Sequence, residues 1–148
     1  MTIYMCVEGG KKHQRELTEQ VVYAVTKKLM PRLKNLEIDI KLDPRLSVKT
    51  GCEGFCLQVD DRQYELEIDS NLGLRDFVTT IVHEMVHVKQ GVRGELRELM
   101  GKQYWKGRVC NKEYMEQPWE KEAYRLQDKL ATWVWENVLW TPTMNEQC

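Results

Sequence analysis

Residues 74–90 read LRDFVTTIVHEMVHVKQ, and the fold expected of the chain is built around this stretch. Its apolar residues recur at helical spacing and cover most of the circumference of a helix. They are Leu74, Phe77, Val78, Ile81, Val82, Met85 and Val88. Asp76 near the start and Gly91 just past the end are residue types typical of helix termini. We therefore expect a mostly buried helix here.

The same stretch contains the pattern HExxH, formed by His83, Glu84 and His87. Residues four positions apart lie on one face of a helix, so the two imidazoles can bind one metal ion while Glu84 deprotonates a water molecule beside it. The alternative is a solvated helix face that carries two histidines and no ion. Because the helix is apolar on most sides, buried imidazoles without an ion would need other polar partners. The pattern therefore predicts a catalytic zinc site with Glu84 as general base.

A catalytic zinc ion usually takes three protein ligands, so a third must come from elsewhere. The one remaining histidine, His13, lies near the start of the first expected helix, and we expect it at the surface. The segment Pro118–Ala123 offers two carboxylates, Glu120 and Glu122, at the start of the last expected helix.

The two carboxylates lie on opposite flanks of the apolar stripe of that helix. The flank of Glu120 continues through Gln127, Ala131, Val134 and Val138, which are uncharged. The flank of Glu122 continues through Arg125, Lys129 and Glu136, which are charged. Glu120 is therefore the predicted third ligand. Alternatively, both are helix-start carboxylates favoured by the helix dipole, and Glu122 pairs with Arg125.

Alternation of apolar and polar residues predicts several short strands before the metal helix. The expected strands cover residues 3–7, 36–42, 55–59 and 64–68, with the last two forming a hairpin. Further helices are expected from Lys12 to Met30 and from Pro118 to about Trp140. Residues 92–117 are not assigned; Glu95–Met100 could be helical, and Tyr104–Gly107 a strand or a turn. These elements predict an α+β domain with a small, mostly antiparallel sheet.

The bulk properties are those of one small domain. With 148 residues, of which 42% are hydrophobic, we expect a single domain over 1–148, with a mobile tail from about residue 142. A net charge of -1 gives no overall attraction to nucleic acids, although the basic stretch 89–112 leaves DNA as a possible partner. We find neither a membrane span nor a signal peptide and expect a cytoplasmic protein. The five cysteines are odd in number and lack CxxC spacing, so we expect them to be reduced thiols.

The two metal-site segments resemble the gluzincin type of zincin metallopeptidases, in which a Glu from a following helix completes HExxH. The segment Glu120-Lys-Glu-Ala-Tyr124 is similar to the ExxA(N/D) segment of the repressor-cleaving ImmA/IrrE-type peptidases, although Tyr124 stands where those carry Asn or Asp. The resemblance implies a zincin-like fold, one zinc ion per chain, Glu120 as ligand and hydrolysis of peptide bonds in a protein or peptide substrate.

Two further resemblances concern the origin of the protein and its partners. The chain looks like the metallopeptidases encoded by phages in its small size, in Trp105–Gly107 and in the PWEKEA segment, which would place the protein in a bacterial host. The stretch HEMVHVKQ also resembles the SprT-like proteases that act at DNA–protein crosslinks. Their third ligand is a histidine, and none follows His87.

The resemblance also suggests residues that assist the reaction. Tyr104, Tyr114 and Tyr124 are candidates to stabilise the oxyanion, although each could be a packing residue. In zincins an edge strand holds the peptide, and residues 55–57 of the expected hairpin, Phe55, Cys56 and Leu57, are the candidates here.

Two alternatives differ in chemistry. Peptide deformylases complete HExxH with an upstream cysteine, and Glu53-Gly-Phe-Cys56-Leu is similar to their EGCL-like segment. Against this, Cys56 alternates away from the apolar face of Phe55, Leu57 and Val59, which is expected to be buried. The second alternative is a binding module without catalysis, with an aromatic docking patch on the last helix formed by Trp119, Trp133, Trp135 and Trp140. Glu84 favours catalysis, because a structural metal site needs no base.

Overall fold

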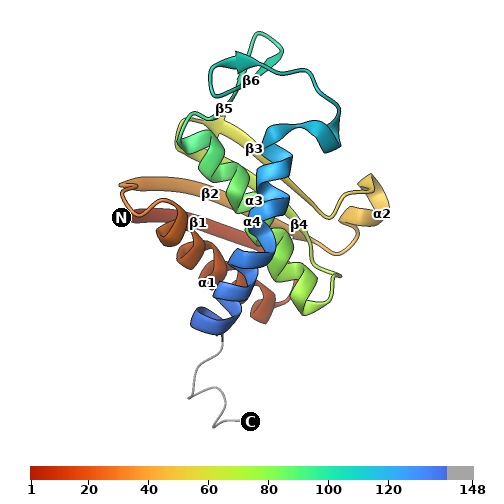
Figure 1. Ribbon diagram of the computed structural model, residues 1–148. Helices are drawn as coiled ribbons and strands as arrows, with labels where there is room; N and C mark the ends of the chain where they lie inside the picture. Colours follow the sequence, from red (N-terminus) through yellow and green to blue (C-terminus); the bar gives the residue numbers. More distant parts are fainter. Residues whose placement is uncertain (140–148) are drawn as a thin grey trace.

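The computed structural model describes residues 1–139, so the tail expected from about residue 142 and the expected helix end at Trp140 lie outside the described residues. The larger of two sheets has the strand order β1-β2-β4-β3. Its strands are β1 (Thr2–Gly9), β2 (Asn35–Asp43), β3 (Gly54–Asp60) and β4 (Gln63–Asp69). Figure 1 shows the domain as an α+β arrangement, as the alternation of short elements predicted.

The expectation of a mostly antiparallel sheet is wrong for this larger sheet. The pairs β1–β2 and β2–β4 are parallel, and only the predicted hairpin β3–β4 is antiparallel. The reason is connectivity: helix α1 (Lys12–Leu29) crosses from the end of β1 to the start of β2, which makes these neighbours parallel. In the hairpin, β4 pairs with β2, and β3 therefore lies at the edge of the sheet.

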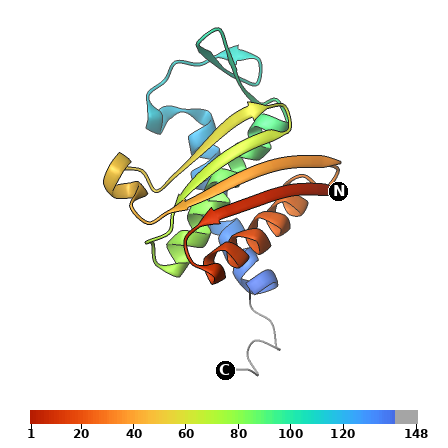
Figure 2. The ribbon, with the colours of Figure 1, turned by 180° about the vertical axis from the view of Figure 1, so that it is seen from behind.

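Three helices cover one face of this sheet. They are α1, α3 (Leu74–Val92) and α4 (Pro118–Val134), which continues as a π-helical segment (Trp135–Leu139). Figure 2 shows the other face of the sheet without a helix across it. The core lies between the sheet and the helices, where Val21, Ile38, Leu66 and Ile81 are almost completely buried. None of the helices in the described part is both long and apolar enough to cross a membrane.

The period of two is borne out on β2, where the apolar residues from Leu36 to Leu42 are buried and those between them are exposed. On β3 the expected assignment of faces is wrong. Phe55, Leu57 and Val59 are 40%, 59% and 48% exposed, whereas Cys56 packs against the core. The inner face of β3 carries small residues because it runs close to α3, and a Cβ added to Gly54 would lie 2.9 Å from Cγ2 of Thr80.

The segment left unassigned by the sequence forms a second, antiparallel sheet. Its strands are β5 (Leu96–Leu99), β6 (Lys102–Trp105) and β7 (Arg108–Val109). The helical alternative for Glu95–Met100 is therefore wrong, and Tyr104–Gly107 is both strand and turn, with positive φ at Lys106 and Gly107. A 3₁₀ turn (Tyr114–Glu116) leads from this sheet into α4. A short helix, α2 (Leu46–Thr50), was also not predicted.

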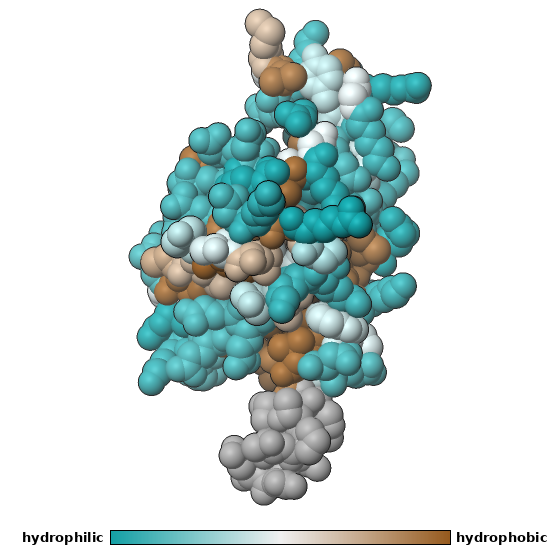
Figure 3. All heavy atoms as spheres, turned by 90° about the vertical axis from the view of Figure 1, so that its left-hand side faces the viewer, coloured by the Kyte–Doolittle hydropathy of each residue, from teal (hydrophilic) through white to brown (hydrophobic). Residues whose placement is uncertain are grey.

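Surface properties agree with this arrangement. Hydrophilic side chains cover most of the face drawn in Figure 3, and hydrophobic ones appear there in small separate areas. Of the tryptophans expected to form a patch on the last helix, Trp119 is buried, Trp133 is half-buried and Trp135 is 40% exposed. Trp140 lies outside the described residues. Trp119 therefore belongs to the interior and not to a docking patch. Cys6, Cys52, Cys56 and Cys110 are free thiols.

Candidate metal centre

The two histidines of HExxH lie on the side of α3 that faces α4, and Glu84 lies beside the edge strand β3. His83 and Glu84 are 8% and 6% exposed, and His87, one turn later, is half-buried. The helix runs from Leu74 to Val92, so both histidines are in its regular interior and project from one face. The predicted buried helix is confirmed, including the close approach of its two imidazoles, whose ring centroids are 5.0 Å apart.

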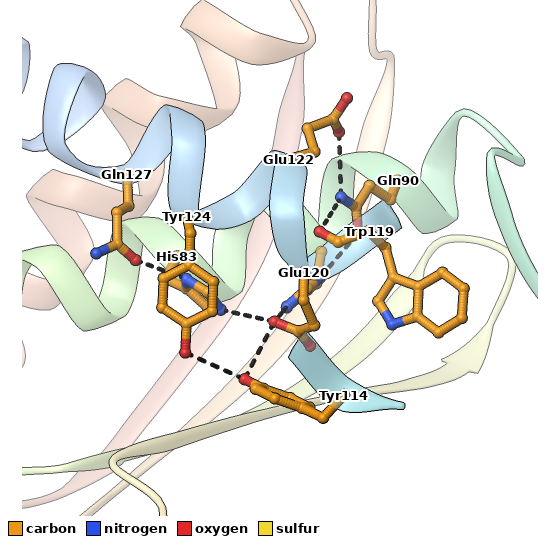
Figure 4. A network of polar contacts seen from close by, with 9 residues as sticks. His83, Gln90, Tyr114, Trp119, Glu120, Glu122, Tyr124 and Gln127 are labelled. Carbon is orange, nitrogen blue, oxygen red and sulfur yellow. Dashed lines mark hydrogen bonds and ion pairs between the residues drawn. The ribbon is translucent and has the colours of Figure 1, made fainter. Parts of the chain in front are cut away.

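The third predicted ligand meets them from α4. Nε2 of His83 lies 3.1 Å and Nε2 of His87 lies 3.2 Å from the same oxygen, Oε1 of Glu120. The ligand atoms of the three side chains all lie within 4.8 Å of one another, which is a group that could hold a metal ion. Figure 4 shows Glu120 pointing from α4 toward His83. Glu120 is 8% exposed, and its predicted inward orientation is confirmed.

The far side of each ring is held by a glutamine that the sequence reasoning did not single out. The Oε1 atoms of Gln127 and Gln90 lie 2.7 Å and 2.8 Å from Nδ1 of His83 and His87, respectively. Because an amide oxygen only accepts, each Nδ1 carries the hydrogen, and a neutral ring then presents the lone pair of Nε2 to the carboxylate. Helical spacing could have suggested both residues, since Gln90 follows His87 by three positions and Gln127 follows Glu120 by seven.

This arrangement calls for a positive charge. Two imidazole lone pairs and a carboxylate oxygen that face one another repel unless an added proton or a metal ion lies among them. Burial disfavours the charged form of His87, but Glu120 outweighs it and raises the pKa of that imidazole. Burial likewise opposes ionisation of Glu120, but hydrogen bonds with the two histidines outweigh it and lower its pKa to about 2. The donor set of two nitrogens and one carboxylate could hold a divalent metal ion.

Glu84 lies beside this group but is not part of it. A Cβ on Gly54 of β3 would lie 3.0 Å from Oε2 of Glu84, so the carboxylate is close to the inner face of the edge strand. Burial raises the pKa of Glu84, while His87 and His83 lower it by a smaller amount. A carboxylate with a raised pKa beside a group that could hold a metal ion is a better proton acceptor than an ordinary glutamate.

Two of the three candidate tyrosines are at the site. The hydroxyl of Tyr114 donates to Oε1 of Glu120 at 3.2 Å and lies 3.3 Å from the hydroxyl of Tyr124, as Figure 4 shows. The ring of Tyr124 packs edge-on against His83, with centroids 4.7 Å apart. Burial, and then the hydrogen bond with Tyr124, raise the pKa of Tyr114, so its hydroxyl remains a donor. Tyr104 is on β6 and does not line the cleft.

The group opens into a cleft of about 1240 Å³ between the two sheets. One wall is the edge strand β3, including Phe55, Cys56 and Leu57. The opposite wall comes from β5 and the turn after it, and the floor comes from α3 and α4. The cleft is thus long enough to follow the edge strand past the metal group.

Cys56 lines the cleft but does not belong to the metal-holding group found among residues 1–139. Burial, followed by the nearby charges of Glu84 and Glu120, raises the pKa of its thiol well above the ordinary value. Cys56 packs against the core and does not point away from the interior, contrary to the expectation. Glu120, and not Cys56, completes the group with the two histidines.

Glu122 does not lie on a solvated flank, and this corrects the sequence reasoning. Its Oε1 pairs with Nζ of Lys89 at 2.9 Å, and its Oε2 forms the expected, longer pair with Arg125 at 4.0 Å. Lys89 also pairs with Glu95 at 2.8 Å and is 8% exposed. The first residue of the basic stretch 89–112 is therefore buried and neutralised and is not available to DNA. His13 is exposed, as expected.

No protein-family model, no curated protein and no solved structure matches the chain. The interpretation of the centre rests on its own geometry and chemistry.

Proposed function

We propose that the chain is a zinc-dependent metallopeptidase of the zincin type, in which His83, His87 and Glu120 hold one zinc ion and Glu84 is the general base. The observation that carries this proposal is the convergence of three ligand atoms within 4.8 Å, with a buried carboxylate beside them and an open cleft in front. A purely structural site usually has four protein ligands and no such base. When bound, zinc would lower the pKa of a water molecule and polarise a carbonyl group.

The residues around the ion have separate tasks in this proposal. Glu84 takes the proton of the attacking water and passes it to the leaving amine. Tyr114 and Tyr124 donate hydrogen bonds to the oxyanion that develops on the carbonyl group. Tyr114 donates to Glu120 at 3.2 Å, so its hydroxyl group would have to turn from this carboxylate to the oxyanion.

The edge strand supports a peptide as substrate. β3 pairs with β4 on one side only, so the other side presents free backbone donors and acceptors along the cleft. An extended peptide paired there would pass the face of α3 that carries Glu84. Phe55 and Leu57 point away from the helices, so we expect the backbone of β3, and not these side chains, to hold the peptide near the ion.

Metal content tests the ligand set. Elemental analysis of the purified protein should find one zinc ion per chain, reduced in Glu120→Ala and kept in Cys56→Ala. Full occupancy in Glu120→Ala would remove Glu120 from the set. Loss of zinc in Cys56→Ala would favour the deformylase-like alternative.

Hydrolysis tests the activity. The zinc-loaded protein should cleave members of a mixed library of unstructured peptides, detected by mass spectrometry as new termini. Glu84→Gln should bind zinc normally and cleave about 10²–10⁴ times more slowly. Equal cleavage by Glu84→Gln would contradict the proposed base. Zinc binding with no cleavage of any peptide by the wild-type protein would favour the binding-module alternative.

A further inference from the structure

The amide group of Gln90 makes three hydrogen bonds next to the proposed metal ligands. It lies on α3 three residues after His87 and is completely buried. Its Oε1 accepts from Nδ1 of His87 at 2.8 Å. Its Nε2 donates to the carbonyl oxygen of Trp119 at 2.9 Å and to Oε1 of Glu122 at 3.1 Å. One amide group thus connects α3 with α4.

The orientation of this amide is determined by its partners. A carbonyl oxygen and an ionised carboxylate can only accept, so the NH₂ group of Gln90 must face Trp119 and Glu122. Its oxygen must then face His87, whose Nδ1 must carry a hydrogen. This leaves Nε2 of His87 as the atom that faces Glu120, 3.2 Å away.

The two contacts on α4 flank the third ligand. Trp119 immediately precedes Glu120, and Glu122 follows it by two positions, all in the first turn of the helix. Glu122 is itself held by Lys89 at 2.9 Å, so the acceptor for Gln90 is fixed. Figure 4 shows the bonds from Gln90 reaching the turn that carries Glu120. A displacement of this turn would therefore move Glu120 and break both bonds of Gln90.

We propose that Gln90 is a positioning residue that sets two of the three metal ligands at once: it fixes the ring of His87 and holds the first turn of α4 that carries Glu120. This inference rests on the proposed metal site. It gives Gln90 a role in the geometry of the site without contact with the ion or the substrate. Partners of this kind commonly change metal affinity by about 10–100-fold.

Gln127 provides a matched control within the same site. Its Oε1 lies 2.7 Å from Nδ1 of His83, and it projects from α4 seven residues after Glu120, so this bond holds the ring of His83 but not the start of α4 that carries Glu120. It is also only half-buried. Removing its amide should therefore affect one ligand, whereas removing that of Gln90 should affect two.

The test compares Gln90→Met, Gln90→Glu and Gln127→Met with the wild type. Three properties are measured: zinc affinity by competition with a chromogenic chelator, the visible spectrum of the Co²⁺-substituted protein, and the ¹⁵N shifts of the histidine rings in the metal-free protein. Gln90→Glu keeps the size of the side chain and the acceptor for His87. Its second oxygen would face two acceptors on α4, so it breaks the α4 contact, and it adds a buried negative charge beside Glu122.

We expect Gln90→Met to bind zinc about 10–100-fold more weakly, with an altered Co²⁺ spectrum and a hydrogen shifted toward Nε2 of His87. Gln90→Glu should lose affinity but keep the hydrogen on Nδ1 of His87. Gln127→Met should lose less affinity than either and leave the His87 shifts unchanged. If Gln90→Met does not fold, the isosteric Gln90→Glu carries the test.

The inference would be overturned if the Gln90 variants kept wild-type zinc affinity, Co²⁺ spectrum and His87 shifts. If the variants lose thermal stability while these three properties stay unchanged, Gln90 is a packing residue and the inference is wrong. Failure of the wild type to bind zinc is a different result, because it would refute the proposed function; the His87 shifts of the metal-free protein would then still decide whether Gln90 orients the ring.

Discussion

Gly54 shows how closely the edge strand approaches the proposed base. A Cβ at this position would lie 2.9 Å from Cγ2 of Thr80 and 3.0 Å from Oε2 of Glu84. Both atoms are side-chain ends, so they can move, but the carboxylate of Glu84 would move with them. The absence of a side chain at residue 54 therefore leaves room for the base.

We predict that Gly54→Ala lowers the free energy of unfolding by about 1–2 kcal/mol, as overpacking of a filled interior does. Peptide cleavage should fall more than this destabilisation explains, while zinc affinity stays unchanged, since no ligand touches the new methyl group. Gly73→Ala is the control, because its Cβ would meet nothing within 4 Å. Unchanged cleavage by Gly54→Ala at full zinc occupancy would show that the strand does not constrain Glu84.

At the scale of single residues, much of the site could be predicted from the sequence. The HExxH pattern pointed to His83 and His87, and the phase of the last helix selected Glu120, because helical geometry relates position in sequence to direction in space; the fold brings these three together. The same reasoning failed for β3, an edge strand next to a cleft. There the exposed residues Phe55, Leu57 and Val59 are apolar, and the period of two does not tell which face is inward.

At the scale of elements, the contact between α3 and α4 combines the metal group with a buried ion-pair cluster. Lys89 of α3 lies between Glu122 of α4 at 2.9 Å and Glu95, just before β5, at 2.8 Å. The exposed fractions of these side chains are 10%, 14% and 20%. One cation thus joins three parts of the fold on the far side of Gln90 from the metal group.

We predict that Lys89→Ala lowers the free energy of unfolding by about 3–5 kcal/mol, because two partly buried carboxylates lose their counter-ion. Lys121→Ala is the matched control: its pair with Glu116 is exposed, at 58% and 65%, and its loss should change stability by less than about 1 kcal/mol. Urea unfolding at pH 7 measures both. Similar losses for the two variants would mean that burial adds nothing to the Lys89 cluster.

The unpredicted helix α2 is attached to the sheet through Asp69 at the end of β4. The carboxylate of Asp69 accepts from the backbone N–H and the hydroxyl group of Ser47, and from the N–H of Asn71 at 2.7 Å. Burial opposes ionisation of Asp69, but these donors outweigh it and lower its pKa. A group with a lowered pKa in the folded state stabilises the fold above its unfolded pKa, and this contribution disappears as the pH falls through the folded value.

Asp69→Asn should therefore be less stable than the wild type at pH 7, by about 2 kcal/mol. The difference should shrink as the pH falls from about 4 toward the lowered folded-state pKa of Asp69, because the unfolded carboxyl group is protonated first and the folded one only at lower pH. Urea unfolding at several pH values provides the measurement, with Asp39→Asn on the exposed face of β2 as control. A difference that stays constant down to the lowest pH at which the protein folds would refute the role of the charge.

At the scale of the whole molecule, the sequence did not predict the features that depend on contacts between distant residues. Alternation identified β1, β2 and the hairpin but could not show that β1, β2 and β4 run parallel, since direction is set by the α1 crossover and by the insertion of β3 at the edge. The strands of the second sheet have four, four and two residues, too few for a clear period. A metal ion would add another non-local link, between residues 83 and 120.

In the proposed function, this link would make the stability of the whole domain depend on metal. The unfolded chain does not hold the three ligands together, so zinc binds the folded form, and free zinc at about 100 times its Kd should add about 2.7 kcal/mol. For a domain of this size we expect a rise in Tm of about 5–10 °C, reversed by a chelator. Glu84→Gln should show the same rise, because the base is not a ligand, whereas Glu120→Ala should show a smaller one. Differential scanning calorimetry at fixed free zinc makes the comparison, and an equal rise in Glu120→Ala would place the stabilising ion somewhere other than between α3 and α4.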